Sequence, residues 1–189
     1  MLLDGITRKP FSKIVDVDGM IAALENPAGH SPLRAKNRIK MRVVGPKGNV
    51  KQEIDHIENI MCTFGLNRLC ELIATGGEAS DWISAYGIGT DTTAANSTQD
   101  ALGASTGSVA LSATTNMNVT DQGNLTLRYL ATFLSNNPAG AAEIHEVGLF
   151  CAEAASAEMA ARAVLGASSV NKGASDQIQI SHDVIFTTA

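Results

Sequence analysis

Residues 34–43 read RAKNRIKMRV, in which basic and uncharged side chains alternate. The basic residues occupy every second position: Arg34, Lys36, Arg38, Lys40 and Arg42. Successive side chains of a β-strand point to opposite faces, so this spacing predicts a strand with all of these charges on one face. We treat the five residues as a candidate partner-binding set and call them the basic ladder.

A hairpin is expected to follow this strand. Residues 45–49 (GPKGN) have turn chemistry, and an extended pattern resumes from residue 50. Pairing Val44 with Asn49 would place opposite charges face to face: Lys40 with Glu53 and Arg38 with Asp55. The hairpin would then neutralise part of its own charge, and a slip of one residue would undo this arrangement.

One short helix is predicted over residues 65–74. Apolar side chains recur there at helical spacing, and two glycines end the pattern: Leu66, Leu69, Cys70, Ile73, then Gly76 and Gly77. On this spacing Cys70 is expected to be a small buried side chain.

The remaining chain predicts strands separated by turns. They are expected at residues 82–89, 125–134, 144–151, 159–165 and 177–187, with a long loop at 90–120 that holds one weak strand near 108–113. One face of the last strand carries Ile178, Ile180, His182, Val184 and Phe186. This pattern predicts a mainly β protein, an antiparallel β-sandwich with one short helix.

The chain divides into an arm and a body. Proline and glycine punctuate residues 1–33, which predicts an extended N-terminal arm, and residues 34–189 form the sandwich body with a basic hairpin at its start. Residues 1–51 carry a net charge of +6 and the remainder −11, which gives the total of −5. A basic front on an acidic body is typical of a partner-binding segment, and nucleic acid, an acidic protein surface or a neighbouring copy would fit it.

The composition of the 189-residue chain argues against several classes of protein. No stretch approaches the ~18 apolar residues of a membrane span, and the start of the chain lacks the pattern of a signal peptide. The 3 cysteines have no disulfide-scaffold spacing, so we expect reduced thiols and synthesis in a cytoplasm.

The sequence carries no pattern of an enzyme. Its histidines (His30, His56, His145 and His182) lack zinc spacing, and the Gly-x-Gly at residues 87–89 lacks the lysine of a phosphate loop. His182 is expected to be a hydrogen-bonded core histidine. The cluster of Glu143, His145 and Glu146 is expected to form a strand rim rather than an acid–base pair. We therefore expect neither catalysis nor a cofactor.

Several short motifs follow one another in order between residues 55 and 187. They are an Asn before a small Gly-containing turn and a Leu-rich helix (59–74), a strand that runs into a GIGTDTTA loop (87–94) with Asp100, Leu102 and Gly103, the segment EVGLF (146–150), Arg162 opening a strand, a Lys-x-x-x-Asp element (172–176), and a final strand ending in Phe186. In this order and spacing the motifs resemble structural proteins of tailed bacteriophage virions. The resemblance leaves out the basic residues 1–51.

The resemblance implies a structural role without catalytic residues. It implies a capsid decoration or cement subunit whose basic N-terminal segment binds the major capsid protein or other virion proteins, assembled as a homo-oligomer, often a trimer. The protein would be located in the virion after synthesis in the host cytoplasm. A tail, neck or fibre-attachment adaptor is the first alternative. A small nucleic-acid-binding module is the second, disfavoured because residues 34–51 contain no aromatic side chain for base stacking.

Overall fold

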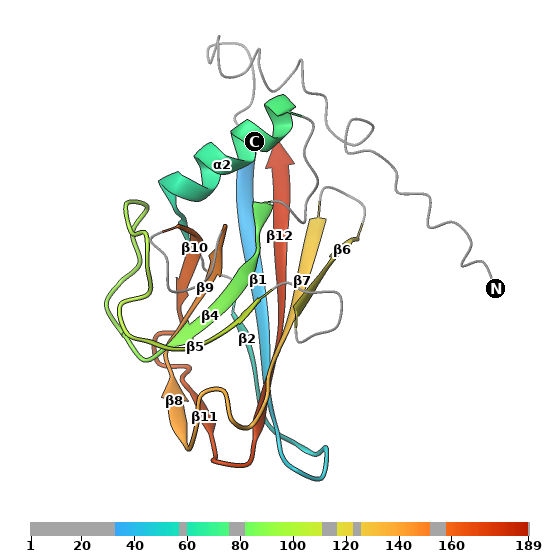
Figure 1. Ribbon diagram of the computed structural model, residues 1–189, viewed down its shortest axis with the longest axis vertical. Helices are drawn as coiled ribbons and strands as arrows, with labels where there is room; N and C mark the ends of the chain where they lie inside the picture. The colour runs from blue at the N-terminus through green and yellow to red at the C-terminus, as the bar shows by residue number, and fades with distance from the viewer. Residues whose placement is uncertain are drawn as a thin grey trace, which may run out of the picture.

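The computed structural model describes residues 33–56, 60–75, 82–110, 117–122, 126–151 and 158–188. These residues form a mainly β fold, with antiparallel sheets stacked as a sandwich and one short helix across an end (Figure 1). The predicted fold class is confirmed. The predicted arm, residues 1–33, lies outside the described residues except for Leu33, which begins the first strand.

The first sheet, sheet A, has the strand order β2-β1-β12-β7-β6. Its two long neighbours, β1 and β12, run antiparallel along their full length at the centre of the sheet. The strands are β1 (Leu33–Val44), β2 (Val50–His56), β6 (Met117–Asp121), β7 (Thr126–Phe133) and β12 (Gln177–Thr188).

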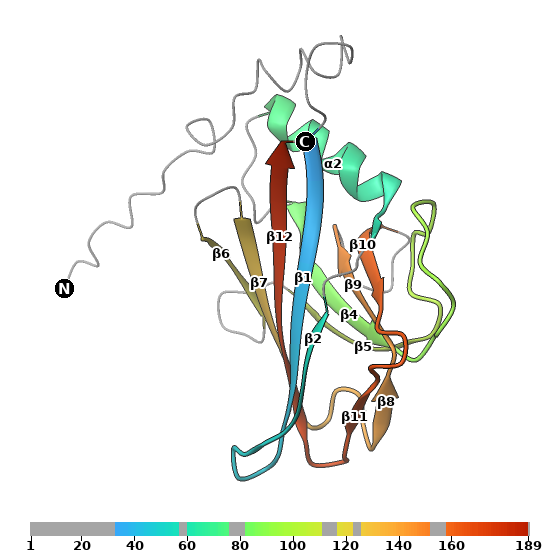
Figure 2. The ribbon, with the colours of Figure 1, turned by 180° about the vertical axis from the view of Figure 1, so that it is seen from behind.

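The second sheet, sheet B, has the strand order β3-β10-β9-β4-β5. Its strands are β3 (Ile60–Met61), β4 (Ala85–Gly89), β5 (Ser105–Ala110), β9 (Glu146–Phe150) and β10 (Met159–Val164). A small two-stranded sheet of β8 (Ala142–Ile144) and β11 (Val170–Lys172) closes the end opposite the helix α2 (Thr63–Thr75) (Figures 1 and 2).

The core lies between the inner faces of the two sheets. From sheet A it takes alternate residues, as the period of two predicts, and these are wholly or almost wholly buried: Ile39, Met41, Val43, Ile178, Ile180 and Val184. From sheet B it takes Tyr86, Ile88, Val147 and Leu149. The predicted inner face of the last strand is therefore confirmed, with Phe186 partly buried at a ring-centroid distance of 6.1 Å from Trp82.

The register of the β1–β2 hairpin differs from the prediction. Val44 pairs with Val50 rather than with Asn49, and a bulge between Val43 and Val44 shifts the rest of the ladder by a further residue. The total shift of two residues keeps every side chain on its predicted face. Gly48 adopts the positive φ of 79° that the tight turn requires.

Helix α2 is confirmed, but its buried face is rotated from the predicted one. Leu69 and Leu72 are buried, whereas Leu66 is 43% exposed. Cys70, expected to be buried, is also exposed.

The cause of this rotation is Gly65. A Cβ at this position would lie 2.4 Å from the Cα of Ala160 on β10, so only glycine allows the helix to approach the sheet this closely. The Nε1 of the buried Trp82 donates a 2.9 Å hydrogen bond to the Gly65 carbonyl. The helix therefore rests on the face of Gly65, Leu69 and Leu72.

Two other predicted segments are divided. The expected loop at 90–120 contains β5 and β6, which leaves an irregular segment only from 90 to 104 within this part of the described chain. The expected strand at 144–151 is interrupted at His145, whose backbone N–H donates to the Gly89 carbonyl at 2.9 Å. The interruption separates β8 from β9.

Candidate functional site

The basic ladder lies on the outer face of sheet A. Lys36, Arg38 and Arg42 are exposed and Lys40 is half-buried, while the intervening side chains point into the core. Arg34 pairs in register with Thr187 on β12, and its side chain lies outside the described residues. The sequence prediction of one charged face is confirmed for the four described members.

Part of this charge is neutralised within the sheet. Arg38 donates to both oxygens of Asp55, at 3.2 Å from Nε and 2.6 Å from Nη2. Arg128 does the same with Asp183, at 2.6 and 2.7 Å. The hydrogen bond from Arg38 lowers the pKa of Asp55 below its usual value. The ion pair predicted for Arg38 and Asp55 therefore forms, although diagonally rather than between directly opposite residues.

Glu53 serves two cations at once. Lys40 Nζ lies 2.9 Å from its Oε1, and Arg42 Nε donates to its Oε2. Hydrogen bonds from Lys40 and then Arg42 lower the pKa of Glu53. One carboxylate between two cations leaves an excess positive charge at this point. Lys36 makes no ion pair with any residue that the structure describes.

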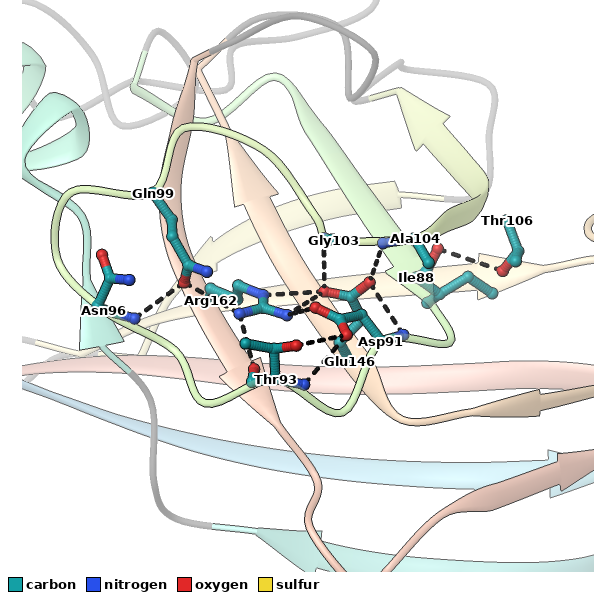
Figure 3. A network of polar contacts seen from close by, with 10 residues as sticks. All are labelled: Ile88, Asp91, Thr93, Asn96, Gln99, Gly103, Ala104, Thr106, Glu146 and Arg162. Atoms are coloured by element: carbon teal, nitrogen blue, oxygen red, sulfur yellow. Dashed lines mark hydrogen bonds and ion pairs between the residues drawn. The ribbon is translucent and has the colours of Figure 1, made fainter.

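The outer face of sheet B is built differently. The irregular segment 90–104 covers it, and Arg162 lies beneath this segment with no exposed surface (Figure 3). Its Nη1 donates to the Thr93 carbonyl and to Gln99 Oε1, each at 3.0 Å. Its Nη2 reaches Asp91 Oδ2 at 2.9 Å and Glu146 Oε2 at 2.8 Å.

Glu146 completes this arginine network from β9. Its side chain is fully buried and accepts the 2.8 Å hydrogen bond from Arg162 Nε. It also accepts backbone N–H groups of the covering segment at 2.8, 3.1 and 3.3 Å, from Ala104, Gly103 and Asp91 respectively. The predicted strand rim is therefore wrong for Glu146, because its charge is compensated by partners from distant parts of the chain.

Asp91 ties the start of the segment to the arginine. Its Oδ1 accepts the backbone N–H of Thr93 at 3.1 Å and the hydroxyl of the same residue at 2.9 Å. These bonds, and then Arg162, lower the pKa of Asp91. All three guanidinium nitrogens and both carboxylates are thus engaged with this chain's own groups, so the network fixes the covering segment on sheet B.

His182 occupies the predicted core position. It is fully buried, and its Nδ1 lies 3.0 Å from the Tyr86 hydroxyl. Its Nε2 lies 2.9 Å from Asn37 Oδ1, a pure acceptor, so Nε2 carries the proton and the tyrosine donates to Nδ1. Burial lowers the pKa of His182 to about 3, so the ring is neutral. The prediction of a hydrogen-bonded core histidine is confirmed.

The Lys-x-x-x-Asp element also turns inward. Lys172 is buried, and its Nζ donates to the carbonyls of Ser135 at 2.9 Å and Gly140 at 3.0 Å. Desolvation lowers its pKa. Asp176 accepts Lys51 at 2.7 Å and the Gly173 backbone N–H at 3.0 Å. Both residues hold the loops at the end of the sandwich.

The arginine network is the arrangement that sequence reasoning missed. The available signal was the isolated charge within an apolar strand, since Arg162 is surrounded in the sequence by alanine and other apolar residues. A buried arginine needs hydrogen-bond acceptors. Asp91, which closely follows β4, and Glu146, the first residue of β9, were the carboxylates in position to supply them. Across the part of the chain that the structure describes, no group of His, Cys, Asp and Glu side chains could hold a metal ion.

No protein-family model, curated protein or solved structure matches this chain. Among the described residues, no helix has the length and apolar character that crossing a membrane requires.

Proposed function

We propose that the protein is a structural protein of a tailed bacteriophage virion, and within the virion a capsid decoration or cement subunit. The observation that carries the proposal is the meeting of three motif residues in one buried network. Asp91, Glu146 and Arg162 come from separate motifs, yet they hold one another and a single surface segment in place. Because these side chains are engaged in holding the fold together, the motifs suit a rigid structural scaffold.

The basic ladder supplies the contact in this proposal. It lies on the outer face of sheet A, away from the arginine network on sheet B, so it can meet a partner without disturbing the scaffold. Charges of both signs alternate on this face, with Arg38, Asp55, Arg128 and Asp183 in adjacent positions. A mixed-charge surface suits a protein partner, because its complement is another mixed-charge surface. The partner proposed is the major capsid protein or a neighbouring virion subunit.

Copy number in particles tests the proposal. Virions are purified from the strain that encodes the chain, and the protein is quantified by mass spectrometry against the major capsid protein. A shell subunit is expected in many copies per particle, on the order of hundreds, because the symmetry of the shell repeats its binding site. A copy number of about a dozen or fewer would instead indicate the tail, neck or fibre-attachment adaptor, which occupies a single symmetry axis. Absence from purified particles would contradict a virion role.

A further inference from the structure

A shallow hollow of about 290 Å³ opens on the outer face of sheet A. Two adjacent rows of outward side chains line it. Arg42, Gln179 and Thr132 form one row across β1, β12 and β7, and Lys40, Ser181 and Leu130 form the next. The hollow therefore combines two cations, three polar side chains that can donate hydrogen bonds, and one apolar wall.

The hollow carries an excess positive charge. Its two cations share the single carboxylate of Glu53, as described above, so together they carry one uncompensated positive charge. Asp55 lies directly opposite Lys40, but both of its oxygens accept hydrogen bonds from Arg38, and Arg128 is paired with Asp183. Excess positive charge therefore lies at two points of the described face, at Lys36 and at the hollow, and the hollow sets its charge beside polar donor side chains.

We propose that this hollow binds a carboxylate presented by an acidic segment of a partner protein. The carboxylate would accept from Lys40 and Arg42 and from the hydroxyl and amide donors of Thr132, Gln179 and Ser181. Leu130, which is 39% exposed, would pack against the apolar stem of the acidic side chain. This inference adds the chemistry of the contact to the proposed function. It rests on that function for one point, that the partner is a protein.

The same geometry argues against a nucleic-acid ligand. A phosphate backbone follows a continuous track of cations, whereas Asp55 and Asp183 interrupt this face beside the hollow. The lining also lacks an aromatic side chain on which a base could stack. A single carboxylate needs only Lys40 and Arg42 and no continuous track of cations.

The test measures binding of a dye-labelled hexaglutamate peptide to the full chain by fluorescence anisotropy. The hexaglutamine peptide and an oligothymidylate of equal charge serve as comparison ligands. We expect hexaglutamate to bind with an affinity that falls as salt rises, and hexaglutamine not to bind. Backbone amide shifts in NMR spectra are expected to concentrate at Thr132, Gln179 and Ser181.

Variants that change the charge inside and outside the hollow locate the site. Lys40→Gln combined with Arg42→Gln should weaken hexaglutamate binding by about 3- to 10-fold, from two exposed charge contacts. Lys47→Gln, an exposed lysine in the β1–β2 turn, should leave the affinity unchanged. Glu53→Gln should strengthen binding, because both cations then face the ligand alone.

Three results would overturn the inference. The first is a loss of hexaglutamate affinity in Lys47→Gln equal to that in the Lys40 and Arg42 double variant. The second is tighter binding of the oligothymidylate than of hexaglutamate, and the third is a set of amide shifts confined to another surface. The outcome is separable from that of the proposed function. A chain absent from virions that still binds hexaglutamate in the hollow would refute only the virion role, and a virion protein that fails these binding tests would refute only the hollow.

Discussion

The two sheets of the sandwich differ in how the charged side chains of their outer faces are exposed to solvent. Sheet A leaves its outer face in water, with burial alternating along β7, and its charges pair on the surface. Sheet B is buried on both faces at its centre, since β4 and β9 are buried at every position. Its outer charges lie beneath the segment 90–104 and bind that segment's backbone. Similar residue types thus face solvent on one sheet and hold the fold together on the other.

The largest expected effect comes from the arginine network. Arg162→Met keeps the bulk of the side chain but leaves Glu146 buried without its cation, so we expect a loss of about 3–5 kcal/mol in the free energy of unfolding. Arg162→Lys, which keeps the charge with fewer donors, should lie between this variant and the wild-type chain. Urea denaturation measures the loss, and limited proteolysis should show earlier cleavage within residues 90–104. A loss below about 1 kcal/mol for Arg162→Met, the level of an exposed charge, would remove the contrast between the faces.

A smaller effect is expected where glycine allows the network to close. A Cβ on Gly89 would lie 2.3 Å from Glu146 Oε1 and 2.5 Å from the Ala104 carbonyl. Gly89→Ala should therefore cost about 1–3 kcal/mol of unfolding free energy through overpacking. Thr132→Ala on the outer face of sheet A is the control and should change stability by less than about 0.5 kcal/mol. Equal effects at the two positions would mean that both outer faces tolerate change alike.

The core between the sheets should respond to acid. The pKa of His182 falls from 6.5 to about 3 on folding, so below pH 6.5 the unfolded chain binds a proton that the folded chain does not. The free energy of unfolding should decrease as the pH is lowered, by up to about 1.4 kcal/mol per pH unit once the unfolded histidine is mostly protonated. The decrease levels off below the pKa of the folded state. Asp183 is the nearby charge that favours the protonated ring, and burial outweighs it.

The window between pH 6.5 and 4.5 isolates this group from the surface carboxylates. Glu53 and Asp55 have pKa values below their ordinary values of 4.5 and 3.8, so their pairs weaken only in more acidic solution. Urea denaturation across this window is the measurement. His182→Gln should abolish the slope whatever its own stability is, and an unchanged slope in that variant would assign the dependence to other groups.

The smallest effect is expected on the outer face of sheet A. The pair of Arg128 and Asp183 is partly exposed, with side-chain exposures of 39% and 13%. A double-mutant cycle with Arg128→Gln and Asp183→Asn should give a coupling of about 0.2–1 kcal/mol that shrinks as salt rises. A coupling of several kcal/mol, insensitive to salt, would show that this face also stabilises the fold.

The sequence predicted the sandwich because a period of two is a local property of each strand. Alternation in β1 and β12 placed the core and the basic ladder correctly. The features that were missed depend on distant residues. The buried face of α2 is set by the approach of Gly65 to Ala160, and the burial of Glu146 is set by Arg162 and by backbone groups far along the chain. The hairpin register depends on a bulge that the turn residues do not reveal.

Lysine acylation of the attached and free protein, read by mass spectrometry, tests most directly whether sheet A is the face that meets a partner. Lys40 lies in the hollow, and Lys47 lies in the turn beyond it. The chain is labelled alone and on purified particles. We predict that attachment protects Lys40 and leaves Lys47 as reactive as in the free protein. Equal labelling of Lys40 in the free and attached states would contradict the assignment of sheet A as the binding face.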